Sequence, residues 1–415
     1  PQQYATIVQH LKAGQPFEPA LRRRLAWEAF RHTAAYDAAI ATWLEVQVTA
    51  QAAEVATTRA GEVATTQPGE LVPAQGAAEP QPAGLPEVWV RHYRKVADLR
   101  YGENPHQPAA FYREMAPAES GGVAAAAQHH GEGLSFNNLL DCEAAWSLAR
   151  DLDQPGCAVV KHTNPCGVAV AADVVAAFER AREADPTSAF GGIVAVNRCV
   201  TDELAAALTA KGQFFECLVA PAYAPEALAR FRAGSAWIAR LRVLEVPASA
   251  QPGRRIPWIV RGLEGGLLVQ APDVPLFRED QDAPWTVATP VAPEPAYADD
   301  LRLAWTVCKH VKSNAIVLVK QGIAIGSGAG QMSRVEATQL AIQRARAVGG
   351  PDAPRGSVLA SDAFFPFPDS IELAAAAGIR AVIQPGGSKR DSDVIGACTK
   401  YGIPMVVTGM RHFRH

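Results

Sequence analysis

A lysine and a histidine stand side by side directly after a short apolar run. Lys161 and His162 follow the strand expected at Cys157–Val160 and open the segment Lys161–Gly167, KHTNPCG. In α/β proteins ligands collect beyond the carboxyl ends of strands, and an imidazole with a reference pKa near ~6.5 can accept a proton at neutral pH. General-base chemistry at His162 and an ordinary hydrogen-bonded loop histidine explain the segment about equally well.

Two other segments place amide and hydroxyl groups at the ends of expected elements. Ser135–Asp141 leads into a helix expected over 140–153, where Asp141 suits the cap position. Capping does not explain two adjacent asparagines after an aromatic residue, so Asn138 is a candidate ligand-binding residue. Lys312-Ser313-Asn314 stands where a second expected helix passes into an apolar strand.

Glycine-rich segments offer close backbone approach to a ligand. Gly326–Arg334 follows an expected strand and opens a helix, a turn that suits an anion or a planar ring. Its glycine spacing matches neither the dinucleotide-binding nor the P-loop pattern, so a dinucleotide site is disfavoured. Gly191-Gly192 ends Asp185–Gly192, although paired glycines also occur at ordinary bends.

Three remaining polar or aromatic segments have competing interpretations. Arg100–Gln107 contains an Asn-Pro turn from which Arg100 could clamp a phosphate, but a surface turn explains it better. The three phenylalanines of Ser361–Asp369 fit a core plug and a ring-stacking wall comparably. The basic tail Arg411–His415 is expected to be solvated unless it docks.

Composition limits the class of protein. The 415 residues carry a net charge of -3, which disfavours nucleic acid as a partner, and 48% are hydrophobic, enough for a sizeable core. Seven cysteines without a CxxC pair indicate reduced thiols rather than disulfides or a zinc site. No apolar stretch reaches the ~20 residues that span a bilayer, and no signal peptide is recognisable, so we expect a cytoplasmic protein.

Short apolar runs alternate with helical stretches from about residue 87, which predicts an α/β fold with parallel or mixed sheets. Strands are expected at Cys157–Val160, Gly192–Val196, Glu216–Ala220, Ile316–Val319, Ser357–Ala360, Ala381–Ile383 and Pro404–Val407. Helices are expected at 140–153, 171–184, 201–211, 223–232, 299–311, 333–348 and 370–377. Residues 16–46 also have helical periodicity, whereas 47–86, rich in Ala, Glu, Gln, Thr, Pro and Gly, are expected to form a linker.

Taken together, these segments resemble a known enzyme family. LRYGENPHQ, GLSFNNLLDCEAAW, KHTNPCG, DPTSAFGG, KSNAI, GAGQMSR, SDAFFPFPDS and RHFRH occur in the order found in the formyltransferase domain of the bifunctional purine-synthesis enzymes. These enzymes combine phosphoribosylaminoimidazolecarboxamide (AICAR) formyltransferase with IMP cyclohydrolase. The resemblance implies two related, cytidine-deaminase-like α/β subdomains with mixed sheets, and a homodimer with active sites at the subunit interface.

The resemblance also implies a domain layout. Residues 1–46 look like the C-terminal helical remnant of a cyclohydrolase domain, whose catalytic part is expected to be missing from this chain. After the linker at 47–86 would come formyltransferase subdomain 1 at 87–270, a connecting segment at 271–298 and subdomain 2 at 299–415.

The implied reaction transfers a formyl group from 10-formyltetrahydrofolate, the co-substrate, to the 5-amino group of the nucleotide AICAR. His162 would be the base, Lys161 would stabilise charge on the formyl oxygen, and Asn314 would orient the formyl group beside the folate. Arg334 would lie near the folate, and Asp362 and Ser313 would be ligands of a K⁺ ion found in some relatives. The implied nucleotide contacts are Arg100, Tyr101, Asn138, Gly191, Glu216, Phe364, Arg411 and His415.

Three other functions remain open at this point. The chain could retain cyclohydrolase activity, or it could be a non-catalytic relic that binds the nucleotide or folate. A cytidine-deaminase activity would need a zinc site. His130-Gly131-Glu132 fits half of that signature, but no PCxxC motif follows it.

Overall fold

The computed structural model describes residues 4–14, 16–62, 88–114, 122–234, 236–247, 258–273, 276–277 and 283–415. Its internal contacts divide the chain into two units, each considered by itself below. Unit 1 comprises Pro1–Ala97 and Phe111–Ser120, and unit 2 comprises Asp98–Ala110 and Gly121–His415. All of the residues to which the sequence assigns a role in the reaction belong to unit 2.

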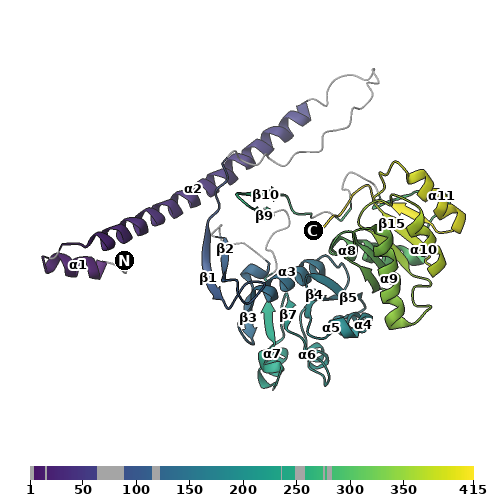
Figure 1. Cartoon of the computed structure of the whole chain (residues 1–415), viewed down its shortest axis with the longest axis horizontal. Helices are drawn as coiled ribbons and strands as arrows, with labels where there is room; N and C mark the ends of the chain where they lie inside the picture. The colour runs from purple at the N-terminus through teal and green to yellow at the C-terminus, as the bar shows by residue number, and fades with distance from the viewer. Residues whose placement is uncertain are drawn as a thin grey trace. The chain divides into compact units, whose positions relative to one another are not determined.

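Unit 1 is dominated by one long helix (Figure 1). After α1 (Tyr4–Lys12), α2 runs over Pro19–Glu62, so it continues into the segment expected to be a linker. The Ala, Glu and Gln residues that made that segment look unstructured are also strong helix formers, which accounts for the difference. Residues 63–86, the rest of the expected linker, lie outside the described residues.

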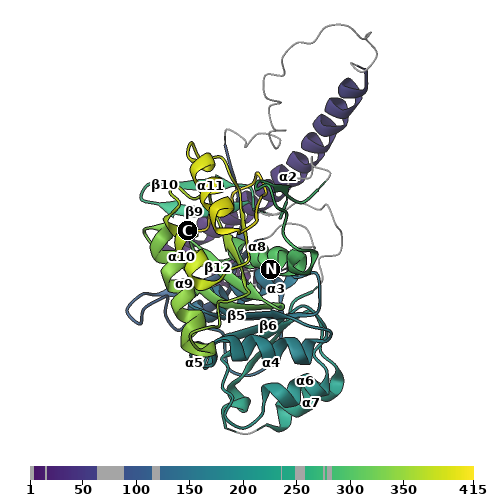
Figure 2. The same cartoon turned by 90° about the vertical axis from the view of Figure 1, so that its right-hand side faces the viewer.

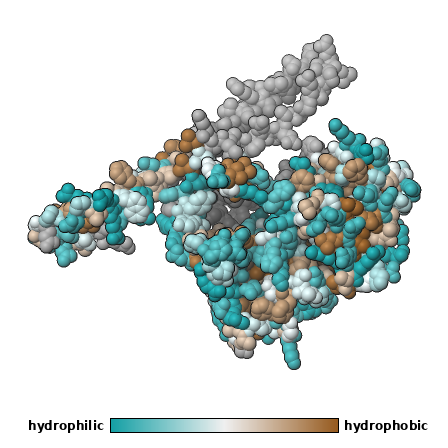
Figure 3. Space-filling model, in the orientation of Figure 1, coloured by the Kyte–Doolittle hydropathy of each residue, from teal (hydrophilic) through white to brown (hydrophobic). Residues whose placement is uncertain are grey.

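The described part of α2 leaves large apolar side chains exposed. Phe30 is 76% exposed and Trp27 is 60% exposed, and Figure 3 shows brown residues among teal ones along this helix. Across the residues that the structure describes, no helix combines the length and apolar character needed to cross a bilayer. Strands β1 (Tyr93–Leu99) and β2 (Ala109–Glu114) pair as a separate two-stranded sheet.

A 12-stranded mixed sheet forms the centre of unit 2, with the order β11-β16-β15-β14-β12-β13-β5-β4-β6-β7-β8-β3. On one side of its middle lie β3 (Ala127–His130), β4 (Gly156–Lys161), β5 (Asn164–Val170), β6 (Ile193–Val196), β7 (Cys217–Ala220) and β8 (Arg242–Glu245). On the other side lie β11 (Thr286–Val287), β12 (Ile316–Lys320), β13 (Ile323–Gly328), β14 (Val358–Ser361), β15 (Ala381–Gln384) and β16 (Met405–Val407). A separate hairpin of β9 (Ile259–Leu263) and β10 (Gly266–Gln270) stands outside this sheet.

The two sides of the sheet repeat one arrangement of elements. In each, a helix precedes an antiparallel hairpin, and the first hairpin strand also pairs antiparallel with the first of three parallel strands. The helices of the first half are α3 (Phe136–Arg150), α4 (Val174–Ala184), α5 (Pro186–Ala189), α6 (Asp202–Leu208) and α7 (Pro225–Ala233). Those of the second half are α8 (Ala298–Lys309), α9 (Arg334–Gly349), α10 (Asp369–Ala377) and α11 (Asp391–Tyr401).

Period-2 alternation of the strands creates three cores. Ala158 and Val160 face the core that contains α3 and α8, whereas Cys157 and Val159 face the core that contains α4, α6 and α7. In the second half, Ile316 and Leu318 face a third core formed with α9, α10 and α11. The sheet is therefore covered by helices on both faces, as Figure 2 shows.

Among the described residues, the strand pairing between the halves of the sheet comprises two residue pairs. β13 meets β5 through Ile323↔Ala169 and Ala324↔Val168, in antiparallel orientation. On each side of this seam a glycine lets a helix approach its strand. A Cβ on Gly167 would lie 1.9 Å from the Ala181 carbonyl oxygen, and one on Gly328 would lie 1.9 Å from that of Ala337.

The predicted α/β fold with a mixed sheet is confirmed, and all seven expected strands and all seven expected helices are present within a few residues. Likeness to cytidine deaminases stays a prediction. β5 and β13 were expected to be loop and turn, because Pro165, Gly167, Gly326 and Gly328 weaken the strand pattern. Gly326 and Gly328 are consequently packing positions within β13, and the interpretation of both as parts of an anion-binding turn is wrong.

The strand registers define one end of the sheet that matters for function. Lys161 at the carboxyl end of β4 pairs with Asn164, and Ile316 at the amino end of β12 pairs with both Gly328 and Ser361. Since β5 and β13 are antiparallel, the amino end of β5 and the carboxyl end of β13 lie at the same end of the sheet. We call this the His162 end.

Candidate active site at the His162 end

The loop expected around His162 is a two-residue hairpin turn between β4 and β5. His162 has φ 52° and Thr163 has φ 62°, both in the left-handed region. Positive φ at both central residues is the mark of the type I′ turn, which matches the twist of the flanking strands. The Thr163 amide donates a hydrogen bond of 2.6 Å to Asp141 Oδ1, while the His162 residue is exposed. The turn thus holds an imidazole at the sheet's edge.

Asp141 lies within α3, so its expected role as helix cap is wrong. Ser135 caps the helix instead, and it forms a reciprocal capping box with Asn138. Asn138 is 8% exposed, and its Oδ1 accepts from the Ser135 amide at 3.1 Å. The pKa of the Asp141 carboxyl lies above its ordinary value, because burial raises it more than the hydrogen bonds from the Thr163 and His162 amides lower it. Asp141 therefore fixes the turn, and its role follows from contacts 22 residues away in sequence.

Asn164 links the turn to the other half of the sheet. Its Nδ2 donates to the His162 carbonyl oxygen at 3.3 Å, and its Oδ1 accepts from the Lys312 amide at 3.1 Å. Lys312 begins the KSN segment that precedes β12. Two segments about 150 residues apart, each expected from sequence to be functional, are thus joined by one side chain.

Asn314 is held by a buried ionic network. Arg334 Nη1 lies 2.5 Å from Asp362 Oδ1, and Arg334 Nη2 donates to Asn314 Oδ1 at 2.9 Å. Asp362 is fully buried and Arg334 is 7% exposed. Arginine can only donate, so the contact fixes which end of the Asn314 amide is oxygen. The Asn314 Nδ2 group donates to the carbonyl oxygens of Gln331 and Met332 at 2.9 and 3.2 Å.

The expected potassium ligands are bonded to protein groups. Ser313 Oγ donates to Asp362 Oδ2 at 2.5 Å, and the other carboxylate oxygen accepts from Arg334. Both carboxylate oxygens of Asp362 thus accept hydrogen bonds within the protein. Across the described residues, no group of three or more His, Cys, Asp or Glu is arranged to hold a metal ion. The potassium site stays a prediction.

The C-terminal segment docks onto Ser313 and Asp362. The Ser313 amide donates to the Arg414 carbonyl oxygen at 2.8 Å, and the Arg414 amide donates back to Ser313 Oγ at 3.1 Å. The His412 amide donates to the Asp362 carbonyl oxygen at 3.1 Å. Arg411 and His415 both contact the Phe413 ring, with the Arg411 guanidinium carbon 4.4 Å from its centroid. The tail is therefore docked, which is the condition under which sequence analysis expected it not to be simply solvated.

A second polar network behind the tail was missed by sequence reasoning. His310 Nε2 lies 2.9 Å from Asp151 Oδ2, Lys309 Nζ lies 3.0 Å from the same oxygen, and Arg414 Nη1 lies 3.3 Å from His310 Nδ1. Because arginine only donates, Nδ1 accepts, Nε2–H donates to Asp151 and the imidazole is neutral.

His310 and Asp151 in this network have shifted pKa values. Burial lowers the pKa of His310, against the opposing hydrogen bond to Asp151. Burial alone would raise the pKa of Asp151, but the hydrogen bond from His310 and the nearby Lys309 charge lower it to about 2. The sequence signal that could have identified this network was the Lys309-His310 pair just before KSN.

The remaining first-half residues also gather at the His162 end. Lys161 Nζ donates to the Phe190 carbonyl oxygen at 2.9 Å, and the Gly191 amide donates to the Phe214 carbonyl oxygen at 2.8 Å. Glu216 directly precedes β7, and its Oε2 lies 3.1 Å from Arg242 Nη1. Ligands were expected beyond the carboxyl ends of strands, yet Gly191 and Glu216 lie at amino ends. β4 is antiparallel to β6, which brings these amino ends beside its carboxyl end.

The phenylalanines of the expected aromatic wall differ in their exposure. Phe365 is fully buried in the third core, so it is a core plug, whereas Phe364 is 38% exposed and could face a ligand.

The loop expected to hold a phosphate contains Arg100, which stacks on Tyr101 with its guanidinium carbon 4.8 Å from the ring centroid. The Asn137 side chain ties the Arg100 loop to α3 through the Glu103 carbonyl oxygen at 3.3 Å. These contacts hold the loop, and the described contacts of the Arg100 side chain reach no further than Tyr101.

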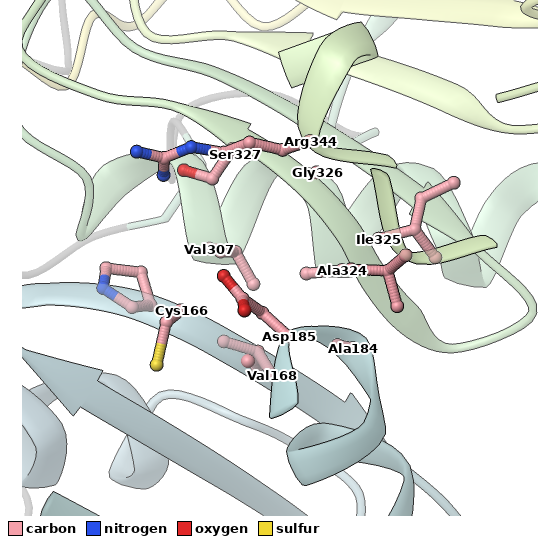
Figure 4. Close-up of a pocket in the computed structure, with 13 residues that line it drawn as sticks. Cys166, Val168, Ala184, Asp185, Val307, Ala324, Ile325, Gly326, Ser327 and Arg344 are labelled. Atoms are coloured by element: carbon pink, nitrogen blue, oxygen red, sulfur yellow. The ribbon is translucent and has the colours of Figure 1, made fainter. Parts of the chain in front are cut away.

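A small, partly open cavity lies at the seam between the halves (Figure 4). Its volume of about 20 Å³ suits roughly one water molecule. Cys166 and Asp185 of the first half line it together with Ser327 and Arg344 of the second, and the Ser327 hydroxyl has no hydrogen-bond partner among the described groups. Burial raises the pKa of Cys166 to about 12, so this thiol is no nucleophile. The cavity is too small for a nucleotide.

Comparison with known proteins identifies the family. The profile described as the AICARFT/IMPCHase bienzyme matches residues 1–344. The bifunctional purine biosynthesis protein PurH of Desulfitobacterium hafniense strain DCB-2 is 42% identical over 418 residues, covering 100% of this chain and 72% of its own length. The protein of the same name from Synechococcus sp. strain WH7803 is 45% identical over 426 residues, with the same two coverages. The chain therefore belongs to the AICARFT/IMPCHase bienzyme family.

Proposed function

We propose that this chain transfers a formyl group from 10-formyltetrahydrofolate to the 5-amino group of AICAR, as a step of purine biosynthesis. Family membership supports an enzyme of purine biosynthesis but does not separate formyl transfer from ring closure. The observation that carries the choice is the Asn164 bridge, which joins the His162 turn to the Lys312–Asn314 segment at one end of the sheet.

The reaction needs a base close to an exposed position. The amine nitrogen attacks the formyl carbon, the bond from that carbon to N10 of the folate breaks, and N10 takes up a proton. The attacking amine is a poor nucleophile because its lone pair is delocalised toward the carboxamide. His162 is exposed on a turn whose backbone is fixed by Asp141, which suits a base that takes the amine proton during attack.

Lys161 and Asn314 would act on the formyl group. The Lys161 ammonium is already held on the Phe190 carbonyl, next to Gly191, so its charge lies at the same end of the sheet as His162. Such a fixed cation would stabilise negative charge that develops on the formyl oxygen. Asn314 is held by Arg334 and two carbonyl oxygens, leaving one lone pair on Oδ1 to orient the reacting groups.

The remaining contacts are proposed by position. Arg100, Tyr101 and Arg411 would hold the 5′-phosphate, and Asn138, Gly191 and Glu216 would contact the ribose and imidazole. Phe364 and His415 would line the nucleotide pocket, and Arg334 would support the folate side through Asn314. Exposed apolar residues on the β9–β10 hairpin, among them Leu263 and Leu268, are consistent with a homodimer that completes the site. Gel filtration with light scattering would test that assembly.

The test is release of tetrahydrofolate by the purified chain given both substrates, followed by absorbance, with His162→Asn in parallel. Asparagine tolerates positive φ, so this variant keeps the turn while removing the base. Its kcat should fall by about 10²–10⁴-fold, with the KM for the nucleotide changed far less. Equal losses in kcat and in nucleotide affinity would remove His162 from the role of base.

A second assay separates the two activities of the family. The chain is incubated with the formylated product alone, and formation of IMP is measured. Ring closure without formyl transfer would overturn the proposal in favour of a cyclohydrolase, and neither activity in a folded chain would favour a binding protein.

A further inference from the structure

The two hairpins at the centre of the sheet are each held by one aspartate from the preceding helix. In the first half, Asp141 of α3 accepts from the Thr163 amide at 2.6 Å. In the second half, Asp300 of α8 accepts from the Gln321 and Gly322 amides, each at 2.7 Å. Asp141 and Asp300 thus occupy equivalent positions in the repeated arrangement.

The two turns differ in the residue at their second position. Gln321 has φ 52° and is followed by Gly322 with φ 74°, whereas His162 has φ 52° and is followed by Thr163 with φ 62°. Glycine adopts positive φ without steric cost, but a β-branched residue there is an outlier that the surroundings must enforce. The first turn consequently depends more on its aspartate than the second.

The surroundings of the first turn also connect it to the site. The Asn164 side chain holds the His162 carbonyl oxygen at 3.3 Å. The Lys312 charge also acts on the Asp141 carboxylate. Gln321, in contrast, is exposed at the opposite end of the sheet, where its carbonyl oxygen accepts from Arg180. Only the first turn carries a residue that could serve the reaction.

We propose that Asp141 is a positioning residue for His162: by holding the Thr163 amide it keeps a strained turn closed and directs the imidazole toward the substrates. The inference rests on the proposed formyl transfer for its kinetic consequence, but not for its structural one. Asp141 does not touch the reacting atoms in this scheme. It acts through the backbone of the turn.

The kinetic test compares Asp141→Ala with Asp300→Ala, which removes the same kind of contact from the other turn. Displacing a reacting group by about 1 Å can cost about 10²-fold, so kcat should fall about 10–100-fold in Asp141→Ala with nucleotide KM within about threefold. Asp300→Ala should keep kcat within about twofold of the parent chain. Asp141→Asn, which retains one acceptor oxygen for the Thr163 amide, should recover most of the lost kcat. Equal kcat losses in both alanine variants, or no recovery in the asparagine variant, would overturn the inference.

A structural readout keeps this test independent of the reaction. In chain labelled with ¹⁵N at threonine, the Thr163 amide should exchange with solvent at least about tenfold faster in Asp141→Ala than in the parent chain or Asp300→Ala. Unchanged exchange overturns the positioning inference whatever the kinetics show. Faster exchange in a chain whose parent form transfers no formyl group would leave the turn assignment standing and the proposed function refuted. Should Asp141→Ala not fold, Asp141→Ser, with a shorter acceptor, takes its place in both measurements.

Discussion

Equivalent positions in the two halves of the sheet carry residues that make different kinds of contact. Asn197 follows β6 as Asp362 follows β14, and their amides donate to the carbonyl oxygens of Gly156 and Ala315, each at 3.3 Å. The Asn197 side chain bonds to the backbone of Gly156, Leu152 and Gln154. Asp362 bonds instead to Ser313 and Arg334, which hold Asn314 and the tail.

The hairpin turns differ in the opposite direction, because here the first half carries the residues that need support. The second half uses Gln-Gly, which needs little enforcement, and the first half uses His-Thr, which needs Asp141. Each half thus has one position whose residues need support from their surroundings, Asp362 in the second half and the His162–Thr163 turn in the first. Both positions lie at the His162 end. Local rules are commonly broken at functional sites, so comparing equivalent positions within one chain locates the site without a relative.

The largest expected effect on stability comes from removing the buried carboxylate of Asp362. Asp362→Ala leaves Arg334 buried without its partner, which should cost about 3–5 kcal/mol in the free energy of unfolding. Asn197→Ala should cost only about 1–3 kcal/mol, since it removes neutral hydrogen bonds. Denaturant unfolding of both variants measures the difference. Asp362→Asn, which copies the first-half residue, should stay close to Asp362→Ala, and parent-like stability would show that the charge is dispensable.

Substitution of the glycines at the helix–strand contacts tests whether the two halves pack their helices equally tightly. Gly167→Ala and Gly328→Ala each place a Cβ 1.9 Å from a helix carbonyl oxygen, so the helix must move away from its strand. Each should cost about 1–3 kcal/mol or more, and the two by similar amounts. Urea midpoints of the two variants provide the measurement. Tolerance of one substitution but not the other would mean that the halves pack their helices differently.

Acid should weaken the connection between α3, α8 and the tail. The pKa of Asp151 is lowered to about 2, so its stabilising contribution is present at neutral pH and is lost as pH falls from about 4 toward 2. The pKa of His310 is also lowered, so stability already declines as pH falls below the ordinary histidine value near ~6.5. Unfolding midpoints at pH 7.5, 5.5 and 3.5 should fall stepwise. In His310→Asn the first step should shrink, and an unchanged first step would remove His310 as its source.

The smallest expected effect is a gain in stability. Gly396 lies inside α11, the counterpart of the glycine-free α7, and a Cβ there meets no atom within 4 Å. Gly396→Ala should therefore raise the free energy of unfolding by about 0.5–1 kcal/mol. A thermal melt would detect the shift, and a loss of stability would indicate that this glycine has a packing role.

Sequence reasoning located the fold where local pattern and burial agree. β4, β6 and β7 are short, buried and mostly apolar runs, and all were predicted. β5 and β13 were not, because the proline and glycines that permit close helix packing are read locally as strand breakers. α2 was predicted too short, since the composition of its second part fits both a helix and a linker.

The same limit applies to the site. His162 was identified as a candidate from its strand-end position beside Lys161, and Asn314 from the family resemblance. Both lie at the His162 end. Asp141 and His310 were not assigned their roles, because both roles depend on contacts with residues far along the chain. A carboxylate in the middle of a helix carries no local sign that it will hold a distant turn.

The docked tail has a consequence for folding of the protein. Residues 411–415 follow every strand of the central sheet in chain order, yet they close over Ser313 and Asp362. Arg414 and Ser313 are 101 residues apart in sequence, so their contact closes a long loop and is expected to form late. A refolding chain would then pass through a state in which the sheet has formed but the candidate active site is still incomplete.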